Sequence, residues 1–211
     1  MGRGMRCAVT VLGLLAVLSF VQSFVLTGAA CELPPPRDPA KPGALYHAMS
    51  GPSRVRFDAK AFLHDFEGKT SQVEGTIRVG DPDRLSDVEA CIRIDAASLD
   101  TGNSTRDGLM RDDHLETARF PTIDFLLEMV DGVTHQAENW EFTARGTLSL
   151  HGVSREIQFP VRARQEGDAI RLAGQLPLNM TDYRIRIPRF FFLTVEDQVV
   201  VSFDVTAGPA K

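Results

Sequence analysis

The sequence predicts an all-β protein whose strands form one antiparallel sheet curled around an apolar interior. Between Arg54 and Val205, apolar and polar residues alternate in run after run, and turn residues separate the runs. A period of two places successive side chains on opposite faces of a strand, one toward water and one toward an apolar interior. Gly75, Gly146 and Gly174 fall on the inward phase inside strands, where glycine relieves crowding in a strongly curved sheet. The glycines therefore favour a barrel over a flat sandwich.

The first thirty residues have the pattern of an export signal. Arg3 and Arg6 precede an almost unbroken apolar run over 8–26, and small residues follow up to Ala30. This pattern predicts cleavage near Ala30 and a periplasmic or secreted protein. A membrane-spanning helix needs about 20 apolar residues, so a retained anchor is an alternative. Cys31, directly after small residues, also resembles a bacterial lipoprotein acceptor, which would give a membrane tether through Cys31.

Residues 31–52 are expected to form a proline-rich linker, followed by a barrel domain over 53–207. The linker composition favours extended chain that buries no core. Cys31 and Cys91 could pair in an oxidising compartment. Cys91, however, falls on the polar phase of its strand, and we interpret it as an unpaired thiol.

Charge argues against nucleic acid as a partner. The formal net charge is −5, and removal of 1–30, with two arginines and no acid, moves it to −7. Phosphate backbones and anionic lipid surfaces attract clustered Lys and Arg, which an acidic domain does not supply.

The first three strands are expected at 54–61, 72–79 and 86–95. The first alternates charged and apolar residues, and a turn at 80–83 with Pro82 separates the second from the third. The alternation then stops, and a helical insert is expected near 105–117. Asn103 or Ser104 can cap this insert, while Leu109 and Met110 contribute to its apolar side.

Five more strands complete the expected set of eight. They are expected at 122–130, 140–150, 156–164, 169–178 and 198–206, each with apolar residues on one phase. In the fourth strand the inward phase includes Phe125 and Met129, and in the fifth it begins at Trp140. Oligomers are left open, since contacts between the edges of two barrels are easy to form.

Two segments carry a family resemblance. The first, from Arg106 to Phe125, contains Arg106-Asp107-Gly108-Leu109-Met110-Arg111, then His114-Leu115, then Phe120-Pro121-Thr122-Ile123-Asp124-Phe125. The second is Gly146-Thr147-Leu148-Ser149-Leu150-His151-Gly152-Val153-Ser154-Arg155. In this order and separation they resemble the YceI-like family, over about 54–206. The resemblance implies an eight-stranded, lipocalin-like antiparallel β-barrel whose elongated apolar cavity holds a polyisoprenoid chain. It also implies a non-catalytic role in isoprenoid quinone or lipid handling, or in envelope stress.

The expected ligand-binding residues are the large apolar side chains on the inward phase, two methionines that can adapt to a flexible chain, and an aromatic run that could cover one mouth. The alternative for each of them is plain core. The predicted set is Phe57, Phe62, Met110, Phe125, Trp140, Phe142, Leu148, Phe159, Leu172, Met180, Phe190 and Phe192.

No catalytic residue, metal or cofactor is expected, apart from a bound isoprenoid lipid or quinone. The sequence has no Gly-x-Ser-x-Gly elbow and no histidine pair with metal-ligand spacing. Arg106, Asp107, Arg111 and Asp182 are expected to form a salt-bridge cluster at the barrel end. Two alternatives remain: a packed barrel that serves as a protein-interaction or stress adaptor, and an enzyme using His64 or His114 at the barrel mouth.

Overall fold

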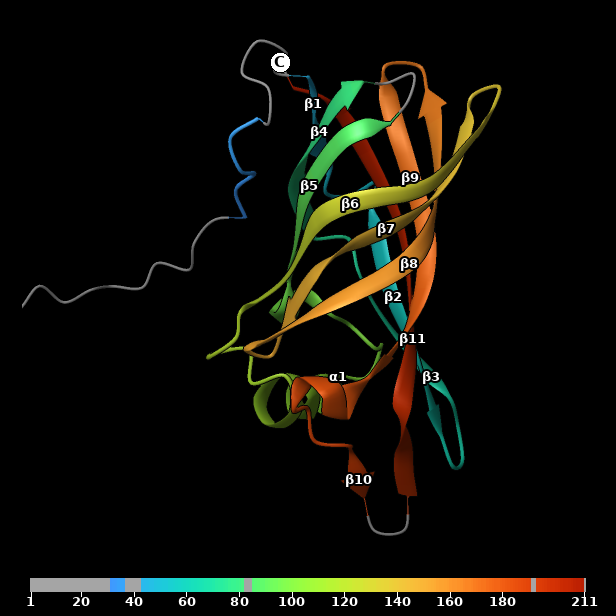
Figure 1. The fold of residues 1–211 in the computed structure, drawn as a ribbon. Coiled ribbons are helices and arrows are strands. Elements are labelled where there is room, and N and C mark those ends of the chain that lie inside the picture. The colour runs from blue at the N-terminus through green and yellow to red at the C-terminus, as the bar shows by residue number, and fades with distance from the viewer. Residues whose placement is uncertain (1–30, 37–42, 82–84, 191–192, 211) are drawn as a thin grey trace, which may run out of the picture.

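The computed structural model of this 211-residue chain describes residues 31–36, 43–81, 85–190 and 193–210. The predicted leader, residues 1–30, lies outside the described residues. The described chain forms one β-barrel with a small helical insert at one end (Figure 1).

Eight antiparallel strands close the barrel, as predicted. Around the ring, each strand pairs with the next, and pairing of the first with the last closes the circle. In ring order they are β1 (Ala44–Ala48), β4 (Val73–Asp81), β5 (Ser86–Asp95), β6 (Thr122–Gln136), β7 (Asn139–Leu150), β8 (Val153–Glu166), β9 (Ala169–Asn179) and β11 (Leu193–Pro209).

The closing strand β1 lies inside the segment predicted as linker. It pairs with β4 on one side and with the end of β11 on the other, with Tyr46 opposite both Ile77 and Pro209. The strand expected first, β2 (Arg54–Ala61), pairs with β11 farther along the same edge. A short strand β3 (Phe66–Thr70), which the sequence pattern did not predict, pairs with β2. One long edge of β11 therefore carries β1 and β2 in succession.

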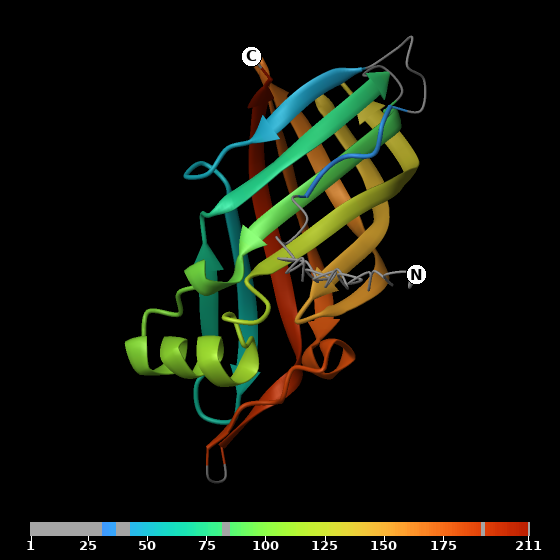
Figure 2. The same cartoon turned by 90° about the vertical axis from the view of Figure 1, so that its left-hand side faces the viewer.

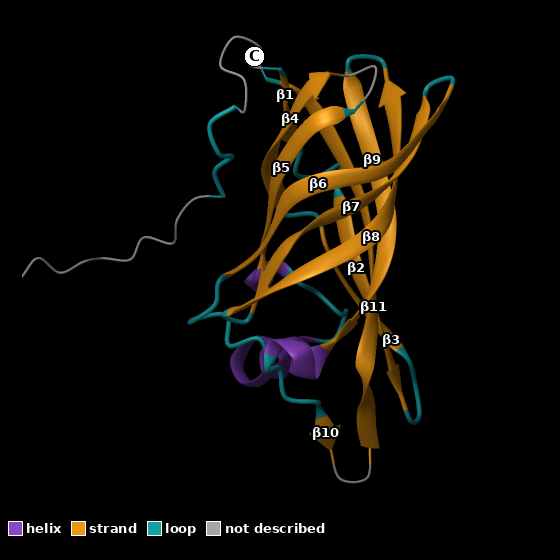
Figure 3. Ribbon diagram, in the orientation of Figure 1, coloured by secondary structure: helices purple, strands orange, loops and turns teal. Residues whose placement is uncertain are grey.

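The helical insert lies at one end of the barrel, here called the helical end (Figures 2 and 3). It comprises η1 (Ala96–Ser98), α1 (Ser104–Leu109) and a π-helical turn η2 (Met110–His114), and a second excursion adds η3 (Met180–Tyr183) and β10 (Arg189–Phe190). Asn103 caps α1 as predicted, because its side chain accepts a hydrogen bond from the Arg106 N–H. Among the described helices, none is long and apolar enough to cross a membrane.

Glycine allows the strands to approach closely where the sequence pattern predicted curvature. A Cβ built on Gly146 would lie 2.1 Å from the Leu126 carbonyl oxygen on the neighbouring strand. A Cβ on Gly75, whose φ is +155°, would lie 2.3 Å from the Cys91 carbonyl oxygen. A larger residue at either position would push neighbouring strands apart.

A β-bulge corrects one inward assignment in β6. The register between β6 and β7 shifts between Leu127 and Met129, and this inserts an extra residue. Leu127 is buried, but Met129 is 48% exposed, and Val130 packs against the core instead. The prediction that Met129 faces inward was wrong because a bulge resets the period of two.

The prediction of an unpaired Cys91 was also wrong, because Cys91 forms a disulfide with Cys31. Their Cα atoms lie 5.6 Å apart. The short N-terminal segment 31–36 thus lies against the outer barrel wall (Figure 2). The Pro34 carbonyl accepts a hydrogen bond of 2.7 Å from Arg78, which also pairs with the buried Glu89. Segment 31–36 therefore covers the outward-facing side of β5 at this place. This cover explains the burial of Cys91.

Candidate functional site: an apolar cavity in two parts

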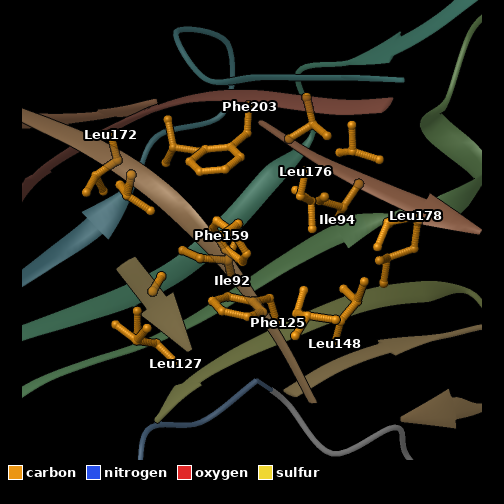
Figure 4. Close-up of a pocket in the computed structure, with 18 of the residues that line it drawn as sticks. Ile92, Ile94, Phe125, Leu127, Leu148, Phe159, Leu172, Leu176, Leu178 and Phe203 are labelled. Atoms are coloured by element: carbon orange, nitrogen blue, oxygen red, sulfur yellow. The ribbon is translucent and has the colours of Figure 1, made fainter. Parts of the chain in front are cut away.

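The barrel interior contains an apolar cavity of about 220 Å³, here called the lumen (Figure 4). Among the described residues that line it, every side chain except Arg56 is apolar. Arg56 lies on the outward phase, and its guanidinium pairs with Asp58 and Glu67 on the outer face. The lumen itself therefore offers a ligand hydrocarbon contacts only.

Six of the predicted ligand-binding residues line the lumen. Their side chains come from five different strands, on the phase that the alternation predicted. They are Phe57, Phe125, Phe142, Leu148, Phe159 and Leu172.

A group of aromatic rings crosses the lumen. The Phe125 and Phe159 ring centroids are 5.2 Å apart, and those of Phe159 and Phe203 are 5.5 Å apart in an edge-to-face arrangement. Phe203 was not among the predicted residues, nor was Leu176 beside it in Figure 4. Both lie on the inward phase of predicted strands, so the same alternation could have identified them.

A second cavity of about 240 Å³, here called the end chamber, lies at the helical end. Met110 and Met180, both predicted, line it. It adjoins the lumen, because six residues line both: Phe57, Leu99, Ile123, Leu150, Leu178 and Val201. The two adjoining parts follow one another from the barrel to the helical insert.

Phe62 does not line this space. It is 75% exposed, because β2 ends at Ala61 and the chain leaves the sheet there. The turn that follows is closed by a hydrogen bond from the Ala61 N–H to Asp65 Oδ1. The prediction of an inward Phe62 was wrong: Phe62 follows Ala61, which lies on the inward phase of β2, so the alternation itself places Phe62 on the outward phase.

Trp140 is on the predicted inward phase but lines neither part of the cavity. It is half-buried, packs against the core and stacks on His135, with ring centroids 4.4 Å apart. Trp140 stands at the start of β7 beside the β6–β7 hairpin, far from the helical end (Figure 1). It therefore lies near the end of the barrel opposite the helical end.

The predicted aromatic cover over one mouth lies mostly outside what is described. The backbone of Phe190 pairs with Leu193 in the β10–β11 hairpin. The side chain of Phe190 and all of Phe192 lie outside the described residues.

The predicted salt-bridge cluster at the barrel end was wrong. Arg106 and Asp107 both bind Thr101: Arg106 Nε donates to its hydroxyl at 2.8 Å, and Asp107 accepts from its N–H and hydroxyl. Hydrogen bonds from the Thr101 side chain hold the pKa of Asp107 below its ordinary value. Arg111 donates to two backbone carbonyls, and Asp182 pairs with Arg155.

The described residues contain no group of three or more His, Cys, Asp or Glu side chains that could hold a metal ion. The arrangement offers a shaped apolar space with few polar groups, which suits binding of a hydrocarbon.

The model of the YceI-like domain matches residues 46–207. The barrel is similar to BcnA of Burkholderia cenocepacia (TM-score 0.64, 19% identity, 75% of this chain and 98% of that one). It is equally similar to a polyisoprenoid binding domain from Saccharophagus degradans implicated in plant cell wall breakdown (TM-score 0.64, 22% identity, 78% and 98% covered). A YceI protein of Campylobacter jejuni follows (TM-score 0.54, 21% identity, 68% and 84% covered).

These solved structures support the fold alone, at identities below 25%. No curated protein matches the chain. The match of the domain model covers nearly the whole barrel, including both segments that carry the family resemblance. The chain belongs to the YceI-like domain family.

Proposed function

We propose that this protein is an exported, non-catalytic carrier that binds a polyisoprenoid or similar lipid in the lumen and end chamber. The observation that carries the proposal is the pair of adjoining apolar cavities, lined by inward side chains of the barrel strands and by the insert. The relative from Saccharophagus degradans, described as a polyisoprenoid binding domain, supports the same class of ligand. Isoprenoid quinone handling and envelope stress are the settings in which such a carrier would act.

The energetics favour long tails. Each buried methylene contributes about 0.8 kcal/mol, so about twenty buried carbons contribute roughly 16 kcal/mol before the cost of association. If association costs about 8 kcal/mol, near the middle of the usual range, the net binding corresponds to a micromolar Kd. Half that tail length would leave almost no net affinity, so chain length dominates selectivity.

A chain-length series tests this function. Prenols of increasing length are titrated into the purified protein by displacement of a fluorescent fatty acid, with a water-soluble short alcohol as control. The affinity is expected to rise steeply with length and to level off when the tail exceeds the cavity. Absence of uptake at every length would overturn the proposal and favour a packed adaptor.

The disulfide bears on the location of the protein and on the state of Cys31. Disulfides persist in oxidising compartments, which supports a periplasmic or secreted location. One sulfur cannot carry both a disulfide and a lipid, so the cross-link competes with a membrane tether through Cys31. Mass spectrometry of protein from its native host distinguishes the disulfide from the lipid tether. A cross-linked peptide pair containing Cys31 and Cys91 supports the disulfide. A lipid on Cys31 with a free Cys91 thiol contradicts it.

A further inference from the structure

The three most exposed large hydrophobic side chains among the described residues all lie at the helical end. They are Phe62, Leu63 and Leu109, here called the apolar group, and they are 75%, 58% and 51% exposed. Phe62 and Leu63 stand in the turn between β2 and β3, and Leu109 ends α1. Exposed apolar side chains concentrated at one end of a protein mark a surface that contacts an apolar partner.

The apolar group borders the end chamber. The Arg106 guanidinium of α1 lies 4.4 Å from the centre of the Phe66 ring of β3, so the helix packs beside the β2–β3 hairpin. Leu109, three residues after Arg106, lines the end chamber and is also half-exposed. Pro188, directly before β10, lines the chamber as well. α1 therefore connects the exposed apolar group to the wall of the cavity.

The same end carries three unpaired arginines. Arg184, Arg186 and Arg189, here called the arginine group, lie between η3 and β10 or within β10, and 184–190 contains no acid. All three are exposed, and none has an ion pair with a described residue. Exposed acids near this end lie on the β2–β3 turn, η2 and β11: Asp65, Asp112, Asp113 and Glu196. A net charge of −5 is thus compatible with a basic segment at the helical end, because net charge does not describe how charges are distributed.

The two groups lie on elements that project at the same end. The β2–β3 hairpin and the paired strands β10 and β11 both extend beyond the helical insert, in two views at right angles (Figures 1 and 2). The apolar group can therefore contact a flat partner while the arginine group contacts it beside them. An anionic lipid bilayer has this chemistry, since acyl chains accept apolar side chains and phosphate headgroups bind guanidinium groups.

We propose that the helical end docks on an anionic lipid bilayer, with the apolar group among the acyl chains and the arginine group at the headgroups. The guest then passes between the bilayer and the end chamber without exposing its hydrocarbon to water. The docking stands on the exposed side chains alone. The passage of the guest rests on the proposed function, because it needs a carrier that binds lipid.

Vesicle flotation tests the docking. Purified protein is mixed with vesicles of phosphatidylcholine alone, or of equal parts phosphatidylcholine and phosphatidylglycerol. Wild type is expected to bind the anionic vesicles at least tenfold more tightly, and less tightly as salt is added. Phe62→Ser should weaken this binding about tenfold, since it removes a large apolar side chain from the acyl region. Arg189→Gln should weaken it about fivefold.

Leu45→Ser and Arg164→Gln are the matched controls. Leu45 is 40% exposed on β1, at the barrel end opposite the helical end (Figure 1). Arg164 is exposed near the end of β8 and has no ion pair with a described residue. Both controls should bind vesicles as wild type does. Absence of wild-type binding to either vesicle, or losses in the controls equal to those of Phe62→Ser and Arg189→Gln, would overturn the docking.

Prenol uptake separates this inference from the proposed function. Phe62→Ser and Arg189→Gln should keep the wild-type Kd for prenol in solution, because neither residue lines the cavity. Both should load more slowly than wild type from anionic vesicles that contain prenol, and equal loading rates would overturn the passage from the bilayer. Wild-type protein that floats with the vesicles but takes up prenol from neither source would overturn the proposed function and support the docking.

Discussion

Filling the lumen with a larger side chain should stabilise the protein or leave its stability unchanged, and it should weaken ligand binding. Ala144 is 3% exposed and lines the lumen from β7. Replacing it with leucine adds three carbons to a cavity of about 220 Å³. A water occupies about 30 Å³ in the liquid, so three groups of that size fit without displacing the wall. At about 0.8 kcal/mol per carbon, burial could add up to roughly 2.4 kcal/mol to the free energy of unfolding.

The matched control is Ala207→Leu. Ala207 is fully buried in the same core but does not line either part of the cavity. The same three carbons then overpack a filled site, at a cost of about 1–3 kcal/mol. Urea unfolding of the two variants and the wild type measures the difference.

Prenol titration measures the second consequence. The leucine at Ala144 takes the place of about three tail carbons, so the Kd is expected to rise roughly 50-fold. If Ala144→Leu destabilises the protein as much as Ala207→Leu and leaves prenol binding unchanged, the lumen is already packed and does not hold the prenol tail.

Three further predictions concern residues outside this comparison. Phe62→Ala should change stability by less than about 0.5 kcal/mol, whereas Phe125→Ala should cost about 3–5 kcal/mol, both measured by urea unfolding; equal losses would place Phe62 in the core. Cys91→Ser should lower the free energy of unfolding by about 2–4 kcal/mol, since the Cys31–Cys91 bridge spans 60 residues; a reductant should lower wild type to the same value and leave the variant unaffected. Asp107 has a lowered pKa in the fold, so its contribution to stability is present above the unfolded pKa of about 4 and is lost as the pH falls below it. Urea unfolding between pH 3 and 7 should therefore show a smaller acid loss in Asp107→Asn, and an identical pH profile would contradict this role.

The period of two predicted most of the barrel because it is a local property of each strand. The predicted bounds of β2 and β5 match the structure, and the inward phase of β7 and β8 is correct along their length. Burial of one face is enough to impose that pattern. What the period does not encode is position along the barrel axis, which is why Trp140 has the predicted phase and lines no cavity.

Features that depend on distant partners were not predictable from local pattern. β1 forms between β4 and β11, and its own burial pattern shows no regular alternation. Cys91 lies on the outward-facing side of β5, and the segment that covers it begins at Cys31, 60 residues earlier in the sequence. Met129 fails for a third reason, because a bulge interrupts the period of two without a clear signal in composition. Phe62 lies next to the inward Ala61, so the alternation correctly applied would have placed it outward.

Native mass spectrometry of protein purified from its native host, without detergent or lipid added, tests whether the barrel carries a lipid. We expect a mass equal to the chain plus one isoprenoid lipid, released on unfolding. A mass equal to the chain alone, unchanged after incubation with long-chain prenols, would contradict it.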